Sequence, residues 1–361
     1  MSDPSRLSRR YTTMVVAVIS LIVLTCAAFL VPVPYVTQKP GPVFNTLGRF
    51  PPTEPGSPLM FTFGKGVTTY PTSGTLDFTT VSVTPADGKV SLLGAIQAYF
   101  DDDNAVVPKS LVYPDDETKE QSTAVSAAQL DSSKDNSKVA ALRAAGYTVT
   151  GRPVVAAVVK GGAAEGAVTA GDIVTEVDGE KVAAPDQVVA AVGRREPGDD
   201  VRLTIERKGK ARAVTITTKA DPQDRTVPRI GISIGTKFSY PISIDNNVGR
   251  QIGGPSAGTM FALAIYDRLT PGELTGGRKI AGTGTIDADG VVGSIGGIRQ
   301  KMAGAARDGV EVFLVPADNC DEATDGDDDG LELVKITRLS DAISSLEALA
   351  KNPKAKVPAC S

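Results

Sequence analysis

Two residues in this chain, Ser256 and Lys301, have types that could perform acyl-transfer chemistry together. The sequence contains no histidine. That absence removes every mechanism in which an imidazole activates a serine or a cysteine, and every zinc site that needs histidine ligands. Ser256 follows a Gly-Gly-Pro turn, and Lys301 ends the segment Ile295–Lys301. If the chain is a hydrolase, a serine hydroxyl activated by a lysine amine is the nucleophile that remains.

Ser256 is expected at the N-terminus of a helix. The residues after it, 257–269, carry apolar side chains at helical spacing: Met260, Phe261, Ala264 and Ile265. At a helix N-terminus, unpaired backbone N–H groups and the positive end of the helix dipole favour negative charge. Glycines on both sides of the serine let a substrate carbonyl approach the main chain. The pattern therefore predicts an oxyanion hole made of backbone N–H groups.

Lys301 is expected on the buried face of a second helix. The pattern predicts this helix over residues 298–308, with Gly309 as its stop signal. Three apolar residues share the face of the lysine: Ile298, Met302 and Ala305. An amine in apolar surroundings shifts toward its neutral form, which can accept a proton from a serine near pH 7. For either segment alone, a helix cap or a solvent-exposed lysine is the alternative, and the combination favours catalysis.

The glycine-rich segments around these residues resemble the proteolytic domain of the Lon-type serine endopeptidases. The segments that carry the resemblance, in the order and spacing of that family, are Gly254–Gly258, Ala281–Ile286, Gly290–Lys301 and Ala305-Ala306 with Gly309. The resemblance implies Ser256 as nucleophile, Lys301 as general base, and Thr283 as a nearby hydroxyl that helps to position the lysine. It also implies protein or peptide substrates and suggests a homo-oligomer, because Lon-type domains commonly form rings.

The sequence departs from the Lon family at two positions and lacks its ATPase module. Gly253 and Thr285 stand where the family commonly has acidic residues, which affects the tuning of the site rather than the dyad. No Walker A sequence occurs. The faint P-loop likeness of Gly253–Gly258 fails because Thr259 and Met260 occupy the positions of the lysine and the hydroxyl residue. We therefore expect no cofactor and no ATP-driven unfolding.

An acidic run near the C-terminus has part of a calcium-binding pattern. Asp325–Gly330 matches the first half of an EF-hand loop, but Ile336 stands where a bidentate glutamate is needed. We expect a solvated acidic loop and no metal requirement.

The segment Met14–Val33 provides about 20 residues without a charge, enough for one helix to cross the hydrocarbon core of a membrane. Three arginines precede it: Arg6, Arg9 and Arg10. The next basic residue is Lys39, so the positive-inside rule predicts a single-pass protein of a bacterial cell membrane, with a cytoplasmic N-terminus and an extracytoplasmic remainder. A cleaved signal peptide is the alternative, although the apolar run continues past the small residues Ala27 and Ala28. Lipidation at Cys26 is a weaker alternative, because this cysteine lies deep in the run.

Composition agrees with a folded, exported protein, at 41% hydrophobic and 22% charged residues with a net charge of −4. Nothing in it indicates nucleic-acid binding. Cys320 and Cys360 fall in the expected extracytoplasmic part, where oxidation is permitted. We predict a disulfide that ties the C-terminal tail to the loop after a strand at 310–315; two separate thiols are the alternative.

Between about Lys138 and Thr218 the pattern changes to short strands and one helix. The predicted elements are strands at 153–159, 173–177, 201–207 and 211–217 and a helix at 185–192. Segments Ala163–Gly166, Ala170–Val174 and Val177–Val182 resemble a PDZ domain of the bacterial protease type. PDZ domains bind extended peptides by adding a strand to an exposed sheet edge. The binding groove is expected to begin at Gly146, Tyr147 and Val149, and whether it recruits substrate or gates the active site stays open.

These features predict an α+β chain with a single N-terminal transmembrane helix, a PDZ module and a Lon-type proteolytic domain of mixed sheets with packed helices. The expected divisions are a cytoplasmic N-terminus (1–13), a transmembrane helix (14–33), a membrane-proximal region (34–122), a PDZ domain (123–222) and a proteolytic domain (223–361). By resemblance, Thr75–Thr84 is the first strand of the proteolytic domain, which would make the PDZ module an insertion. The predicted function is an ATP-independent, membrane-anchored serine endopeptidase that cleaves extracytoplasmic proteins. The competing prediction is a catalytically inert PDZ scaffold that recruits partners at the membrane.

Overall fold

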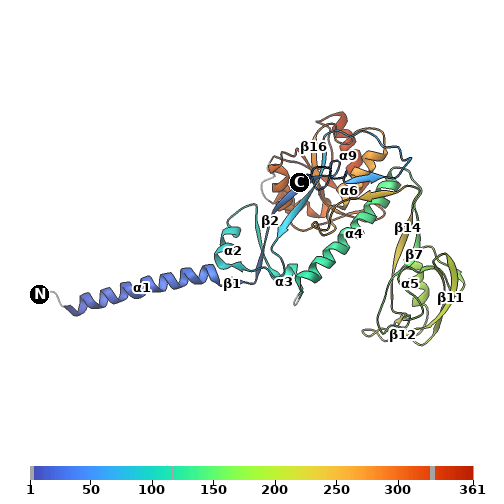
Figure 1. Cartoon of the computed structure of the whole chain (residues 1–361), viewed down its shortest axis with the longest axis horizontal. Coiled ribbons are helices and arrows are strands. Elements are labelled where there is room, and N and C mark those ends of the chain that lie inside the picture. Colours follow the sequence, from blue (N-terminus) through green and yellow to red (C-terminus); the bar gives the residue numbers. More distant parts are fainter. Residues whose placement is uncertain (1–3, 115–116, 326–329, 361) are drawn as a thin grey trace. The chain divides into compact units, whose positions relative to one another are not determined.

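The chain forms two compact units in the computed structural model, which describes residues 4–114, 117–325 and 330–360 (Figure 1). The split unit contains the residues up to Gly146 and those from Ile242 onward. The inserted unit is Tyr147–Pro241. Both units combine helices with strands, so the fold class is α+β, as the sequence predicts.

The N-terminal helix α1 (Pro4–Leu30) contains a long apolar segment. Residues Tyr11–Leu30 are long and apolar enough to cross a membrane, and none of this segment is buried against protein. Leu21 and Phe29, for example, expose 65% and 58% of their surface. Such a surface is unfavourable in water. The helix therefore has the properties of a membrane anchor or of a signal sequence.

A six-stranded sheet forms the centre of the split unit, in the order β20-β19-β16-β4-β2-β6. Its strands are β2 (Tyr35–Asn45), β4 (Thr75–Val83), β6 (Ala105–Pro108), β16 (Lys279–Gly282), β19 (Val312–Pro316) and β20 (Glu332–Ile336). The strands from β20 to β4 are parallel, whereas β2 and β6 are antiparallel to their neighbours. Because β4 pairs directly with β16, the segments before and after the inserted unit build one sheet.

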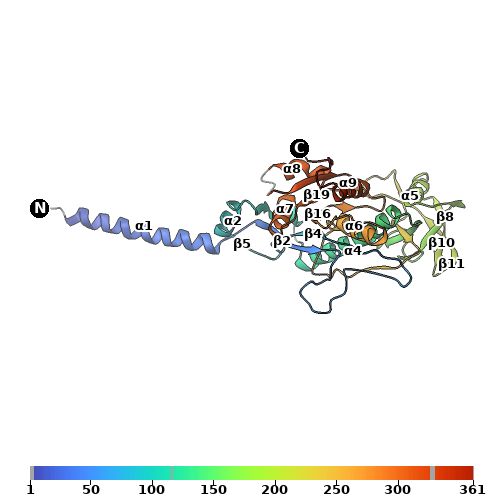
Figure 2. The ribbon, with the colours of Figure 1, turned by 90° about the horizontal axis from the view of Figure 1, so that it is seen from above.

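Helices pack on this sheet and position the residues discussed below. They are α4 (Lys119–Ala144), α6 (Gly258–Leu269), α7 (Ile298–Arg307), α8 (Cys320–Thr324) and α9 (Leu339–Lys351). Helices α4, α6 and α9 contact one another, while α7 contacts β2, β4 and α8. Figure 2 shows α6 and α7 on the two sides of β4 and β16. Phe78 of β4 packs its ring against Phe44 and Phe261, with ring centroids 5.3 and 5.4 Å away, which fixes α6 to the sheet.

Short elements complete the split unit. They are β1 (Pro32–Val33), β3 (Phe61–Phe63), β5 (Val90–Ser91), α2 (Leu92–Tyr99), α3 (Lys109–Val112), β15 (Ile244–Asn246), β17 (Thr285–Ile286), β18 (Val292–Gly293) and a 3₁₀ turn at Ala317–Asn319. The turn at Asp289-Gly290 closes a hairpin of β17 and β18. The preceding strand β16 belongs to the central sheet, where its apolar residues Ile280 and Ala281 are buried between β4 and β19.

The inserted unit is a sheet of order β11-β10-β8-β7-β14 with β9 at its side. Its elements are β7 (Thr150–Val158), β8 (Ile173–Val177), β9 (Glu180–Lys181), α5 (Pro185–Gly193), β10 (Asp200–Arg207), β11 (Lys210–Thr217), β12 (Lys219–Ala220), β13 (Pro228–Arg229) and β14 (Ile232–Ser239). Strand β14 lies beyond residue 222, where the sequence suggested that the PDZ module ends, and it pairs antiparallel with β7. An isoleucine-rich strand has the same pattern in either unit, so its partner could not be inferred from the sequence.

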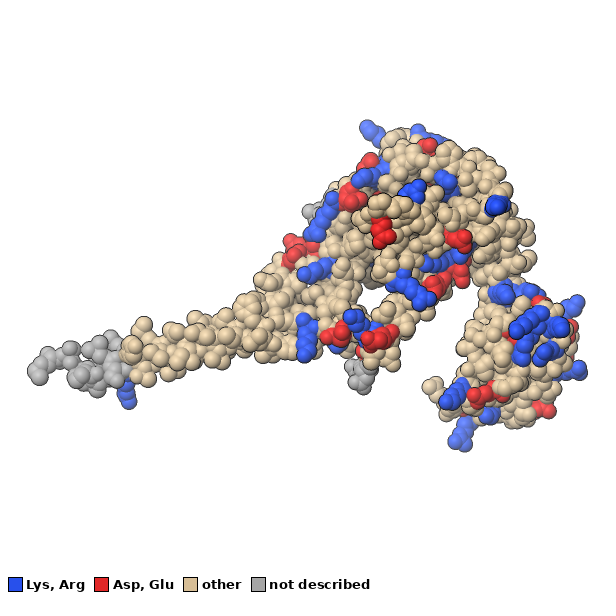
Figure 3. Space-filling model, in the orientation of Figure 1, with Lys and Arg blue, Asp and Glu red and all other residues tan. Residues whose placement is uncertain are grey.

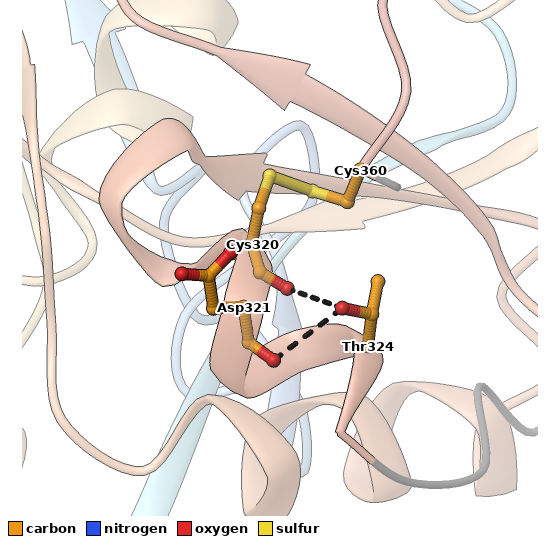
Figure 4. The surroundings of a disulfide bond; sticks show 4 residues. All are labelled: Cys320, Asp321, Thr324 and Cys360. Carbon is orange, nitrogen blue, oxygen red and sulfur yellow. Dashed lines mark hydrogen bonds between the residues drawn. A yellow bond between two sulfur atoms is a disulfide. The ribbon is translucent and has the colours of Figure 1, made fainter.

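A disulfide joins Cys320, the first residue of α8, to Cys360 (Figure 4). The Thr324 hydroxyl donates to the carbonyls of Cys320 and Asp321, which closes the short helix. The disulfide holds the C-terminal tail next to β20. There the N–H of Lys335 donates to the carbonyl of Pro358 in the tail. Most of the acidic run 325–330 lies outside the described residues.

Candidate active site

Ser256 lies in a tight turn immediately before α6. Gly254 has a φ of +83°, a conformation that L side chains rarely adopt, so the turn requires glycine there. The N–H of Gly254 donates to the Ser126 carbonyl at 3.0 Å. The hydroxyl of Ser133 donates to the Pro255 carbonyl at 2.9 Å. Helix α4 thus holds the turn through two consecutive residues, Gly254 and Pro255.

Gly258, the first residue of α6, allows a close approach of neighbouring segments. A Cβ at this position would lie 2.7 Å from Ser133 Oγ and 2.9 Å from Ile286 Cγ2. Both distances are shorter than real Cβ contacts, so any side chain would push α4 or the β17–β18 hairpin away. The glycine therefore fixes the start of α6, and with it the serine.

Lys301 projects from α7 into the protein interior, and only 3% of its surface is exposed. The predicted apolar stripe of the helix is buried with it: Ile298, Met302 and Ala305. The Nζ atom lies 2.8 Å from Ser256 Oγ, 2.9 Å from Thr283 Oγ1 and 3.4 Å from the Thr79 carbonyl oxygen. The structure thus brings Ser256, Lys301 and Thr283, the three residues selected from the sequence, into direct contact.

Burial changes the protonation of this lysine. Loss of water around the amine lowers the pKa of Lys301 from 10.5 to about 7. Desolvation penalises the charged form, and it is the only cause of the change. Near neutral pH a substantial fraction of the amine is therefore uncharged, with a lone pair that can accept a proton.

Thr283 lies just after β16 and orients the amine. Its hydroxyl donates to the Ser256 carbonyl at 3.0 Å, so its lone pairs are left to accept from Lys301. A neutral amine has two N–H donors and one lone pair. The Thr283 hydroxyl and the Thr79 carbonyl can accept the two N–H groups, which leaves the lone pair for the hydroxyl of Ser256. The three contacts suit a neutral lysine that acts as a base.

Two backbone donors stand next to the serine hydroxyl. Within the described part of the chain, the N–H groups of Ser256 and Ala257 have no hydrogen-bond acceptor. Ala257 is the N-cap of α6, where the helix dipole is positive. Free donors at a helix N-terminus are suited to a developing oxyanion.

A cleft of about 540 Å³ opens onto Ser256 and Lys301. Residues 78–83 of β4 line one wall, and residues 251–254 line another. A neighbouring hollow of about 470 Å³ shares Val81, Val83, Gln251 and Gly253 with it. The two hollows therefore adjoin along β4 and the segment before Ser256.

The inserted unit contains a separate groove of about 580 Å³ between β14 and α5. Its apolar lining includes Val188, Val189, Val192, Ile232 and Ile234. Strand β14 ends the sheet order, so in the described residues one of its edges has no partner strand. The expected groove residues Gly146, Tyr147 and Val149 do not line this groove. Strand β14, and not the entry segment, forms the edge of the sheet at this groove.

Sequence reasoning did not find three contributors to the site: the backbone carbonyls of Thr79 and Ser126 and the hydroxyl of Ser133. A backbone carbonyl has no sequence signature. The hydroxyl of Ser133 is a small polar group on a helix with buried positions, but its partner Pro255 lies more than 100 residues away in the sequence.

Two segments match known domain families. Residues 249–349 match the Lon protease (S16) C-terminal proteolytic domain, and residues 125–218 match the PDZ domain. A Lon protease of Rhizobium meliloti (strain 1021) is 33% identical over 94 residues, which are 25% of this chain and 11% of that protein. A Lon protease of Endomicrobium trichonymphae is 24% identical over 177 residues, 44% of this chain and 22% of that protein. The chain thus covers less than a quarter of the length of either relative.

Among solved structures, the PDZ domain of the SdrC-like protein from Listeria monocytogenes is 25% identical. That likeness has a TM-score of 0.22 and covers 23% of this chain and 86% of that chain. The two family matches confirm the sequence resemblance at the level of domains. The chain contains a Lon-type (S16) proteolytic domain and a PDZ domain, and a long apolar helix near the N-terminus precedes both in the sequence.

Proposed function

We propose that this chain is a serine endopeptidase in which Ser256 is the nucleophile and Lys301 the general base. One observation carries the proposal: the Lys301 amine, 3% exposed, lies 2.8 Å from the Ser256 hydroxyl. A lysine in a structural ion pair would face a carboxylate. This amine instead faces two neutral oxygens and a backbone carbonyl, which is the environment that a proton acceptor needs.

The proposed reaction is acyl transfer in two steps. Ser256 Oγ attacks the scissile carbonyl carbon as its proton moves to Lys301 Nζ, and the N–H groups of Ser256 and Ala257 stabilise the tetrahedral oxyanion. The lysine ammonium then returns the proton to the departing amine nitrogen, which leaves an acyl-enzyme. Water, deprotonated by the same lysine, attacks the ester carbonyl; the bond to Ser256 Oγ breaks, the lysine ammonium returns the proton to Oγ, and the acid is released.

The proposed setting is the outer surface of a membrane. Helix α1 would anchor the chain, with the rest of the split unit and the inserted unit on the extracytoplasmic side. The disulfide of Cys320 and Cys360 supports that side, because disulfides persist in oxidising compartments. No ATP is required in this scheme, so the substrates would be loose segments, disordered tails or misfolded proteins.

The groove between β14 and α5 is proposed to bind extended peptide segments. A peptide would add a strand to β14, the last strand in the sheet order, and its apolar side chains would contact Val189 and Val192 of α5. Bound peptide would raise the local concentration of substrate for the proteolytic domain. The competing function is an inert scaffold, in which this groove binds partners and no cleavage follows.

Cleavage of casein, a disordered protein, by the full chain in detergent without ATP tests the proposal. Wild type and Ser340→Ala, an exposed serine on α9, should produce fragments. Ser256→Ala should produce none while keeping the circular dichroism spectrum and melting temperature of wild type. Equal cleavage by Ser256→Ala would refute the assignment. Folded wild type that binds peptide but never cleaves would favour the scaffold.

A further inference from the structure

Helix α2 has an unusual distribution of side chains. Its small residues Ala95 and Ala98 are buried. Its large apolar residues face outward instead: Leu92 exposes 43%, Ile96 43% and Tyr99 75% of their surface. These three residues recur at i, i+4 and i+7, so they form one face of the helix. A surface helix in water normally buries such a face.

One neighbouring residue enlarges this apolar face. Phe100, the C-cap of α2, is 79% exposed and packs its ring edge-on against Tyr99, with centroids 5.5 Å apart. We call Leu92, Ile96, Tyr99 and Phe100 the α2 face.

The α2 face adjoins the end of the apolar helix α1. The N–H of Leu92 donates to the carbonyl of Val31, the residue that follows α1, at 3.3 Å. Strand β1 pairs with β5 directly before α2, which fixes this junction. Figures 1 and 2 both show α2 beside the end of α1. In the view of Figure 3, the uncharged surface of α1 continues onto the part of the split unit next to it.

The geometry of a membrane span places this junction at the lipid headgroups. The segment Tyr11–Leu30 has 20 residues, and 20 helical residues span about 30 Å, the thickness of the hydrocarbon core. Leu30 would then lie at the boundary of that core. The next residue, Val31, accepts the hydrogen bond from the first residue of α2, so α2 would lie at the same boundary. Tyrosine, with an apolar ring and a polar hydroxyl, is enriched at such interfaces.

We infer that the α2 face lies in the headgroup region of the outer leaflet, so that the split unit contacts lipid at a second place beside α1. This inference rests on the proposed anchoring by α1. The contact is driven by apolar area, because Asp101 and Asp102, both exposed, follow Phe100 directly. Binding should therefore occur on uncharged phosphatidylcholine and should not depend on anionic lipid.

The absence of tryptophan from the chain permits a direct test. Full-length Phe100→Trp is reconstituted into phosphatidylcholine vesicles, with lipids brominated either near the headgroup or near the end of the acyl chain. Leu21→Trp reports separately on the span, and Val291→Trp, exposed beside the start of α9, is the control outside the membrane. Quenching of Phe100→Trp by the shallow bromine, several-fold stronger than by the deep one, is expected. Leu21→Trp should show the reverse order, and Val291→Trp no quenching.

The outcomes distinguish failure of the inference from failure of the anchor. Deep quenching of Leu21→Trp without any quenching of Phe100→Trp would overturn the inference and leave the anchor intact. A blue-shifted but unquenched Phe100→Trp would also overturn it, since protein and not lipid would then cover the face. No quenching of either reporter would overturn both.

Discussion

The cleft at Lys301 and the groove between β14 and α5 have similar volumes but different linings. The cleft depends on one buried amine with three oxygen neighbours at 2.8, 2.9 and 3.4 Å. The groove is lined by a row of apolar side chains beside β14, the last strand in the sheet order of the inserted unit. In the proposed function, chemistry would therefore be concentrated in a few atoms of the split unit, whereas peptide recognition would be distributed over an area of the inserted unit.

This difference predicts how each region responds to change. A site that depends on the protonation of one atom should fail completely when that atom is removed. A surface that binds through summed apolar contacts should lose affinity in proportion to what is removed. The following experiments test whether the two regions respond in these different ways.

Lys301→Met should give the largest effect. Without an acceptor for the serine proton, casein cleavage should fall by at least about 10³-fold. The free energy of unfolding should rise at pH 6, because burial of the amine, which lowers its pKa from 10.5 to about 7, costs the wild-type fold up to about 5 kcal/mol there. Denaturant unfolding measures this change. In wild type this cost decreases as pH rises from about 7 to 10.5. In that range the lysine is neutral in the folded chain but still protonated in the unfolded chain, so the free energy of unfolding rises with pH.

The control is Lys335→Met, an exposed lysine on β20. It should leave both cleavage and stability close to those of wild type. A Lys301→Met protein that is inactive and also much less stable would indicate a structural role for the lysine, which would break the contrast between the two regions.

The pH dependence of wild-type cleavage should give the next largest effect. The neutral amine is the active form, and burial lowers its pKa to about 7. The value of kcat/KM should therefore fall about tenfold for each pH unit below 7 and reach a plateau at higher pH. Initial rates on a short, unstructured peptide measure this profile. A plateau that extends unchanged to pH 5 would exclude Lys301 as the base.

Ser256 and Lys301 could be selected from the sequence because their signals are local. Glycines before α6 and an apolar stripe on α7 are features of short segments, whereas Thr283 was selected only by the resemblance to the Lon-type domain. The structure brings the three side chains into contact. The supports from α4 and the groove in the inserted unit are different, since both depend on pairing between distant segments. Strand β14 follows the Asp-Pro turn where the PDZ module was expected to end, yet it pairs with β7. Register across a long separation is not encoded in a local pattern.

Val189→Glu should give a moderate effect on the groove. Val189 lines the groove and is 55% exposed, so the fold should tolerate the change. A charge among apolar contacts should weaken binding of a peptide with an apolar C-terminal residue about tenfold. Ala190→Glu is the matched control, because Ala190 is the next residue on α5, is exposed and lies outside the groove lining. Fluorescence anisotropy measures affinity, and equal loss in both variants would place the peptide elsewhere.

Ser133→Ala, a change on α4 outside the cleft lining, should give the smallest effect on cleavage. The Ser133 hydroxyl holds the Pro255 carbonyl at 2.9 Å, so its loss frees one side of the turn that carries Ser256. One hydrogen bond of about 1 kcal/mol corresponds to a fall of about fivefold in kcat, with KM unchanged. Ser132→Ala, an exposed neighbour on α4, should have no effect. A defect in Ser133→Ala alone would show that α4 helps to hold the turn that carries the nucleophile. An unchanged kcat would show that the glycines of the turn position the serine without help from α4.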